Sequence, residues 1–289
     1  MSDIQFIKRK NISFAISALL IIVSLYSFIT KGLNYGIDFT GGTLLHYQFE
    51  NEFENEKINE VLEKSGIDGS IQRVTDGKNE IIITTTFLDT ERKKEFRDIL
   101  RREVGNLTED GIKRETDIGP TVGRELKENA TKAVLWSIIA ILIYISARFD
   151  FKFAAAAIIA LIHDSIITIG IFSILAKEIN NTMIAALLTL LGYSLNDTIV
   201  VCDRIRENTK KFKNSDFDEM VNTSINQSLS RTIHTSLTTL IPVLTLFFFG
   251  GEILRNFALA LLIGVLVGTY SSIFIASPII TIWNKGKVR

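Results

Sequence analysis

Six apolar stretches, each long enough to cross a lipid bilayer as a helix, dominate the sequence. They occupy residues 12–31, 132–148, 153–176, 182–202, 232–250 and 256–283. The hydrocarbon core of a bilayer is about 30 Å thick, which about 20 apolar residues in a helix can span. Backbone polar groups in lipid must bond within their own segment, so isolated spans fold as helices. The sequence therefore predicts an α-helical polytopic membrane protein with six transmembrane helices.

The first apolar stretch follows the basic residues FIKRK, a flank that secretory signal sequences share. Its apolar run is longer than the core of a signal peptide, about 7–15 residues, and no small-x-small cleavage site follows it. Residues 1–31 are therefore expected to be a basic cytoplasmic N-terminus and a retained first span.

The distribution of Lys and Arg predicts the orientation. With the N-terminus inside, the inner side collects 14 of these residues, whereas the short outer loops hold only Lys177 and Arg255. Cytoplasmic loops carry the excess of basic residues in membrane proteins. Both termini are thus predicted to be cytoplasmic and residues 32–130 to be outside. Residues 131–289 are expected to form the second to sixth spans, with a cytoplasmic loop at about 204–231.

The outer segment has its own pattern and is acidic, with 21 acidic and 14 basic residues. Strand-like stretches (TLLHYQFE, SIQRV, NEIIITTTF, GIKRETDIG) alternate with two helical ones (EKINEVLEKSG, TERKKEFRDILRREVG). The sequence TDGK between the second and third strands is a hairpin signal. This order, β-α-β-β-α-β, predicts a small ferredoxin-like α+β domain. The following TVGRELKENATKAV is expected to continue as helix into the second span.

Several biochemical classes lack support in the sequence. The formal net charge is +0, which argues against a nucleic-acid partner. The single cysteine, Cys202, excludes an intramolecular disulfide and a Cys-based zinc site. No P-loop is present for ATP, and GIDFTGG, residues 36–42, is more typical of a tight turn than of a phosphate loop. The prediction is a protein that is not an enzyme and needs no cofactor.

Two aspartates lie inside predicted spans, where a charged side chain is costly and is usually functional. Asp164 follows His163 about halfway along the third span. Asp197 lies six residues before Asp203, about 9 Å from the inner edge at a rise of 1.5 Å per residue. An intramembrane aspartyl protease would need a carboxyl dyad. The Gly-x-Gly-Asp signature of those enzymes is absent, because Asp197 follows YSLN.

Other polar residues accompany these carboxylates. Helical spacing places Tyr193 and Ser194 on the Asp197 face, and Arg231 with Thr235 and Thr238 on one face of the fifth span. For Ser194, Asn196 and the threonines, interhelical hydrogen bonding is favoured over a role in an ion path. Hydrogen bonding is a weaker explanation for Asp197, because neutral residues would bond at a lower desolvation cost. It stays open for Asp164, and His163 is expected to be a packing residue.

Small residues recur every four positions in the last span, at Ala260, Gly264, Gly268, Ser272 and Ala276. Such a face lets helix backbones approach closely. It predicts close packing and carries no separate functional prediction.

The chain resembles the SecF family, the smaller subunits of the bacterial SecDF accessory complex of the Sec export machinery. The matching stretches are GLNYGIDFTGG, ALIHD, AALLTLLGYSLNDTIVVCDRIREN, SINQSLSRTIHTSLTTL, FGG and FALALLIGVLVGTYSSIFIASP, between residues 32 and 278. The family usually has Phe where Cys202 stands.

This resemblance implies half of an RND-type transporter, with SecD as the other half. It implies a multi-pass protein of the bacterial cytoplasmic membrane that uses the proton gradient to help the SecYEG channel move unfolded polypeptides outward. Asp197 and Arg231 occupy the positions of the family's proposed ion-path residues. We expect protonation of Asp197 to switch its partnership with Arg231, with Asp164 as a second step. The alternative function is a stand-alone RND-like exporter of small molecules or lipids.

Overall fold

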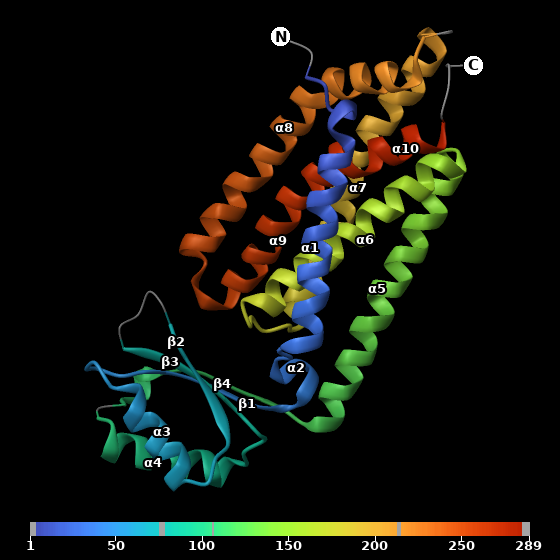
Figure 1. Ribbon diagram of the computed structural model, residues 1–289. Coiled ribbons are helices and arrows are strands. Elements are labelled where there is room, and N and C mark those ends of the chain that lie inside the picture. Colours follow the sequence, from blue (N-terminus) through green and yellow to red (C-terminus); the bar gives the residue numbers. More distant parts are fainter. Residues whose placement is uncertain (1–3, 75–78, 106, 213–214, 285–289) are drawn as a thin grey trace. The chain divides into compact units, whose positions relative to one another are not determined.

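The computed structural model describes residues 4–74, 79–105, 107–212 and 215–284 (Figure 1). The chain divides into two compact units, one of residues 1–34 and 132–289 and the other of residues 35–131. The first unit holds the apolar helices, and the second holds all the strands of the described residues.

Six spans of sufficient length and hydropathy are found among the described residues, so the prediction of a six-helix membrane protein is confirmed. Five spans are single helices: α1 (Lys10–Thr30, after the short η1, Ile7–Arg9), α5 (Pro120–Arg148), α6 (Phe151–Ile174), α7 (Asn181–Lys211) and α8 (Phe217–Phe249). The sixth span joins three segments: α9 (Gly251–Ser271), η3 (Ser272–Ala276) and α10 (Ser277–Trp283). The helix expected to lead into the second span is confirmed, because α5 begins at Pro120.

The centre of the membrane unit is formed by α6, α7 and the sixth span, which are about half buried, whereas α5 and α8 are mostly exposed. Lipid tails are as apolar as leucine, so the spans gain little by burying their largest apolar side chains. Helix α1 shows this directly. Its serines Ser13, Ser17, Ser24 and Ser27 are buried, and most of its leucines and isoleucines are exposed.

Small residues set the packing of α1 on α6. The hydroxyl oxygens of Ser27 and Ser173 lie 2.7 Å apart. A Cβ added at Gly170 would overlap the side chain of Ser24 and lie 3.0 Å from its Cα. The two helices are therefore in contact at their backbones.

The small-residue face of the sixth span packs on α7, as predicted. A Cβ at Gly264 would collide with the side chain of Leu190, and one at Gly268 would lie 2.9 Å from the Cβ of Ser194. Three further members of this face, Ala260, Ser272 and Ala276, are buried.

The sixth span changes its winding within the bilayer, at the π-helical segment η3. The hydroxyl of Ser277 donates to the carbonyl of Ser272 at 2.9 Å. Pro278, in the first turn of α10, brings no N–H for a helical bond to a preceding carbonyl. Single π turns of this kind are frequent at functional sites.

The stretch from 204 to 231 is largely helical, because α7 continues to Lys211 and α8 begins at Phe217. The second turn of α8 holds the chain before α1. The Oδ1 atom of Asn222 accepts from the backbone N–H of Phe6 at 2.8 Å, and its Nδ2 donates to the carbonyl of Ile4 at 3.1 Å. The start of α1 is thereby fixed on α8.

The second unit contains one antiparallel sheet and two main helices. The strands are β1 (Gly42–Gln48), β2 (Gly69–Arg73), β3 (Glu80–Thr85) and β4 (Ile112–Ile118), in the order β2-β3-β1-β4. The helices are α3 (Asn55–Lys64) and α4 (Thr90–Glu103), and the short η2 (Glu109–Gly111) precedes β4. This order confirms the ferredoxin-like prediction. The predicted TDGK hairpin, residues 75–78, lies outside the described residues.

Alternation along the strands creates the core of this unit. Leu45 and Tyr47 of β1 and Ile81 and Ile83 of β3 are fully buried, and they share one cluster with residues of both helices, among them Phe96. Successive strand residues point to opposite faces, so the intervening positions form the other face of the sheet.

The glycines of GIDFTGG make a tight turn. Residues Ile37–Thr40 form the single helical turn α2, and Gly41 and Gly42 follow with φ values of 74° and 142°. A Cβ at Gly41 would lie 2.8 Å from the Cα of Pro120, and one at Gly42 would overlap the carbonyl oxygen of Thr85. Both the backbone conformation and the close approach require glycine.

Candidate functional site

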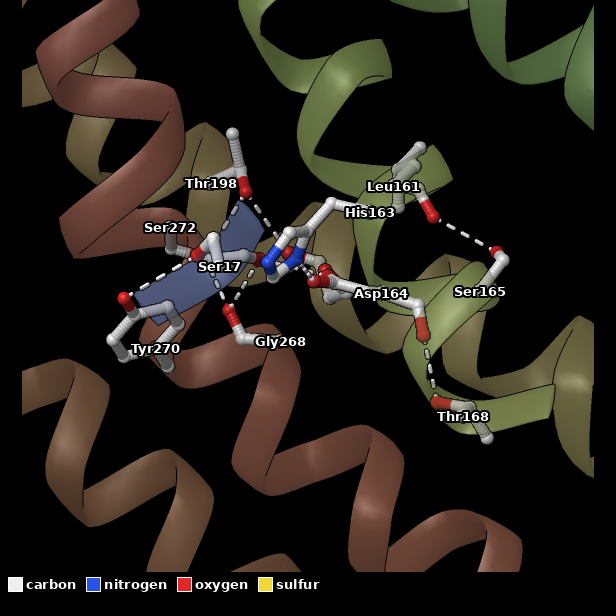
Figure 2. Close-up of polar contacts among 12 residues, drawn as sticks. Ser17, Leu161, His163, Asp164, Ser165, Thr168, Thr198, Gly268, Tyr270 and Ser272 are labelled. Atoms are coloured by element: carbon white, nitrogen blue, oxygen red, sulfur yellow. Dashed lines mark hydrogen bonds and ion pairs between the residues drawn. The ribbon is translucent and has the colours of Figure 1, made fainter. Parts of the chain in front are cut away.

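Asp164 is fully buried in the middle of α6, where side chains from three helices converge on its carboxylate (Figure 2). Its Oδ2 atom accepts hydrogen bonds from Ser194 of α7 at 2.5 Å and from Ser271 of α9 at 2.7 Å. Its Oδ1 atom lies 2.9 Å from Nδ1 of His163. Both carboxylate oxygens are therefore bonded, and Asp164 connects α6 to α7 and α9.

Asp197 is also buried, with 2% of its surface exposed, but it is weakly bonded. Its one hydrogen-bond contact among the described residues comes from Ser236 of α8, whose hydroxyl oxygen lies 3.5 Å from Oδ2. That distance is beyond the usual range for O–H···O bonds. Ser236 lies much closer, at 2.6 Å, to the hydroxyl of Thr269 of α9. The Asp197 carboxylate is thus available for a further ligand.

Two buried hydroxyls have no hydrogen-bond partner within the described part of the chain, and each lies one helical turn from Asp197 or Ser236. They belong to Tyr193, four residues before Asp197 on α7, and Thr232, four residues before Ser236 on α8. Residues four apart share a helix face. Buried polar atoms are nearly always bonded, so these two hydroxyls are candidates for contact with a proton, water or ion.

Arg231 and its two threonines lie on another face of α8. Arg231 and Thr238 are exposed on this chain, and Thr235 is half-buried. The Thr235 hydroxyl donates to the carbonyl of Arg231 at 2.8 Å. The described residues show no hydrogen bond or ion pair between Arg231 and Asp197, so their partnership remains a prediction. A long arginine side chain at the end of a span can reach water or turn inward.

The other predicted path residues are divided between the two carboxylates. Ser194 contacts Asp164, whereas Tyr193 lies near Asp197 in helical position only. Asn196 is exposed on the surface of α7.

Spacing along a single helix does not identify three further candidate residues, because they reach the carboxylates from other helices. Ser236 and Thr269 meet at Asp197, and Ser271 meets Asp164. A signal was present in the sequence GTYSS, residues 268–272, which places polar side chains in the middle of the sixth span.

The polar contacts around Asp164 continue towards α1, through Tyr270 and Ser17 (Figure 2). The Tyr270 hydroxyl donates to the carbonyl of Ser13 at 2.9 Å and lies 3.3 Å from the hydroxyl of Ser17. Thr198 of α7 and Ser272 approach to 3.0 Å between their hydroxyl oxygens. Within the described part of the chain no three His, Cys, Asp or Glu side chains are grouped to hold a metal ion. These polar contacts are made by groups that can hold and pass protons.

In the small unit, a partly buried polar cluster is centred on Glu115. Glu115 accepts from the Tyr47 hydroxyl and from Arg97, both at 2.7 Å. Burial, together with the hydrogen bond to Glu115, raises the pKa of Tyr47 well above its usual range. This cluster ties β1, β4 and α4 together, and stabilises the fold.

The sequence matches two family models. Residues 100–286 match the model described as protein export membrane protein SecD/SecF, C-terminal. Residues 26–52, which include the glycine turn, match the SecD/SecF GG motif.

Curated relatives and a solved structure show the same similarity. The chain is 42% identical over 290 residues to the protein translocase subunit SecF of Desulfurispirillum indicum, covering 97% of this chain and 92% of that one. It is 44% identical over 266 residues to the subunit SecDF of Thermus thermophilus, covering 90% of this chain but 36% of that longer one. The crystal structure of SecDF from Thermus thermophilus, described as a translocon-associated membrane protein, superposes with a TM-score of 0.90 at 41% identity, covering 98% of this chain and 39% of that one.

Proposed function

Because the chain belongs to the SecD/SecF family of protein export membrane proteins, we propose that it works with a SecD partner as an ion-driven subunit of the Sec machinery. In this role it assists the movement of unfolded polypeptides through a SecYEG channel and across the bacterial cytoplasmic membrane. The small ferredoxin-like unit lies outside and contacts the emerging polypeptide, and both termini are cytoplasmic.

The need for a SecD partner is supported by the fused relative. The chain covers 36% of the length of the SecDF protein of Thermus thermophilus, so most of that protein corresponds to other sequence. The mostly exposed spans α5 and α8 offer apolar surface that a second helical bundle could cover. A SecD chain would complete the assembly.

The observation that carries ion coupling is the contrast between the two buried carboxylates. The Asp164 carboxylate has three close hydrogen-bond contacts, whereas within the described part of the chain Asp197 has one, at 3.5 Å. A carboxylate that is already saturated resists a change of ligand. Asp197 can bind a proton directly on its carboxylate, taking it up from one side of the membrane and releasing it to the other.

In the proposed cycle, Arg231 moves in response to the protonation of Asp197. When Asp197 loses its proton, the carboxylate attracts the guanidinium of Arg231, and when it gains one the attraction ends. Each elementary charge that crosses about 100 mV provides about 2.3 kcal/mol. That energy is sufficient to bias two arrangements of helices that differ by a few kcal/mol.

The test is proton flux in proteoliposomes that contain the assembled complex. Asp197→Asn keeps the size of the side chain and removes its titration, so flux and gradient-stimulated export should both fall to background. Asp203→Asn is the matched control on the same helix, because Asp203 is an exposed partner of Arg206 at 2.7 Å. It should leave both activities near the wild-type level, since exposed ion pairs contribute about 0–1 kcal/mol. Wild-type flux in Asp197→Asn would mean that Asp197 is structural.

The second candidate function is a stand-alone RND-like exporter of small molecules or lipids. A homodimer of this chain would also supply two six-helix halves. Purification from the native membrane distinguishes the two, because a SecD-like chain in stoichiometric amount supports the first function and a homodimer alone supports the second.

A further inference from the structure

His163 has one bonded and one unpaired ring nitrogen, although the residue is 4% exposed. Its Nδ1 atom lies 2.9 Å from the Asp164 carboxylate, and its Nε2 atom has no hydrogen-bond partner within the described part of the chain. An ionised carboxylate accepts from an Nδ1–H, which leaves Nε2 as the unprotonated nitrogen of a neutral ring. This nitrogen is a buried acceptor without a donor.

The donors around Asp164 are neutral. They are the hydroxyls of Ser194 and Ser271 and the ring of His163. The spans packed around the pair contain no Lys or Arg in residues 11–30, 153–176, 182–202 and 256–283. A buried carboxylate without a positive partner is costly, and a proton on His163 would supply that partner within the pair.

The groups that face the His163 ring allow such a change of charge. The titratable residue packed against it is Tyr270, whose ring stacks at 6.3 Å between centroids and whose hydroxyl donates to Ser13 of α1. Helix α1 adds Ser17, α7 adds Ser194, and neither η3 nor α10 contains a titratable side chain. Asp197, one turn beyond Ser194 on α7, has its contact with Ser236 of α8.

Ser271 has a second acceptor that matches a protonated Asp164. Its hydroxyl oxygen lies 2.7 Å from Asp164 Oδ2 and 3.1 Å from the carbonyl of Gly268. If the proton of the pair moves onto the carboxyl group, the Ser271 hydroxyl can donate to Gly268 and accept from Asp164. Ser271 ends α9 immediately before the π-helical segment η3. Ser271 thus connects the Asp164 carboxylate to the point where the sixth span changes its winding.

We infer that His163 and Asp164 form a single proton-binding site, separate from Asp197, that takes up one proton through His163 Nε2 and binds the sixth span through Ser271. The inference deepens the proposed function, on which it rests for its role in ion movement. One proton from the solvent binds to Nε2, and the net charge of the His163–Asp164 pair changes from −1 to zero. Asp197 and this pair are then two successive proton sites in one layer of the membrane unit.

The test reads the protonation of the ring directly and needs no transport activity. The chain has 3 histidines, so isotope-labelled histidine in the complete complex in nanodiscs gives three imidazole signals, assigned by His46→Gln and His234→Gln. We expect the His163 nitrogen shifts to change from the Nδ1–H neutral form to the doubly protonated form as the pH is lowered. Asp164→Asn should abolish this change, and Asp197→Asn should leave it in place.

Three results would overturn the inference: a His163 ring that stays neutral throughout, one that stays doubly protonated throughout, or a titration that Asp164→Asn does not alter. A change caused by sodium at constant pH, absent with potassium, would identify a sodium site in its place. His163→Asn keeps a donor near the Nδ1 position without a titrating nitrogen. We expect this variant to retain assembly of the complex while it loses the pH dependence of proton flux, and an unchanged pH dependence would also refute the inference. If the proposed role of Asp197 is wrong, Asp197→Asn will keep wild-type proton flux, and the His163 signals will still change with pH.

Discussion

The hydroxyl oxygen of Ser236 lies 3.5 Å from the carboxylate of Asp197 but 2.6 Å from the hydroxyl of Thr269. Ser236 is thus bonded to α9 and is only in weak contact with the carboxylate of α7. A modest rotation of α8 would change this contact first. This contact predicts that the Ser236 face of α8 serves the proposed ion path.

Ser236→Ala removes the hydroxyl that lies 3.5 Å from the Asp197 carboxylate. We expect proton flux in the assembled complex to fall by no more than about fivefold, since even a well-formed hydrogen bond contributes only about 1 kcal/mol. Thr245→Ala is the matched control, because Thr245 is exposed and donates to the carbonyl of Ile241 in its own helix. A larger loss in Thr235→Ala than in Ser236→Ala would assign the path to the Arg231 face instead.

Gly170 and Gly268 are predicted to be intolerant of larger side chains. Even an alanine at Gly170 would overlap Ser24, and leucine at Gly268 would displace Ser194 from α9 and from Asp164. Overpacking of this type costs about 1–3 kcal/mol or more. The yield of folded complex after detergent extraction should fall for Gly170→Ala and Gly268→Leu. Gly192→Ala, where a Cβ would meet nothing within 4 Å, should behave as wild type.

Tyr47 is predicted to make the small unit sensitive to alkali. Its pKa in the folded protein lies above that of the unfolded chain, so its contribution to stability is complete below about pH 10 and is lost as pH rises through the folded value. Tyr47→Phe should lower the stability of the unit by about 1 kcal/mol at neutral pH, because the hydrogen bond to Glu115 is lost.

The measurement is protease resistance of the unit in urea, at about pH 8 and about pH 11, on either side of the ordinary tyrosine pKa. Wild type should lose more stability between the two conditions than Tyr47→Phe. Tyr35→Phe, which changes an exposed ring beside Lys127, should retain the full alkaline loss. Equal alkaline losses in the wild type and Tyr47→Phe would contradict the prediction.

The proposed orientation predicts opposite labelling at two exposed lysines. A cysteine at Lys94 in α4 should react with a membrane-impermeant reagent added outside, whereas one at Lys210 near the end of α7 should react only after the membrane is opened. The native Cys202 is buried and needs replacement by alanine in both variants. Reversed labelling would invert the topology and the direction of the proposed proton path.

The sequence by itself determined the number of spans, the ferredoxin-like order of the small unit and the close-packing face that contains Gly264 and Gly268. These features depend on local quantities: the length of an apolar run, the period of alternation and the spacing of small residues along one helix. The tertiary structure alone decided which polar groups meet. Ser194 was grouped with Asp197 by helical spacing, yet it donates to Asp164, and Ser236 and Ser271 reach the carboxylates from helices distant in the chain. The physical reason is that spacing gives the face of a residue on its own helix, whereas its partner depends on how neighbouring helices are rotated and shifted, which backbone contacts such as Ser24 with Gly170 fix.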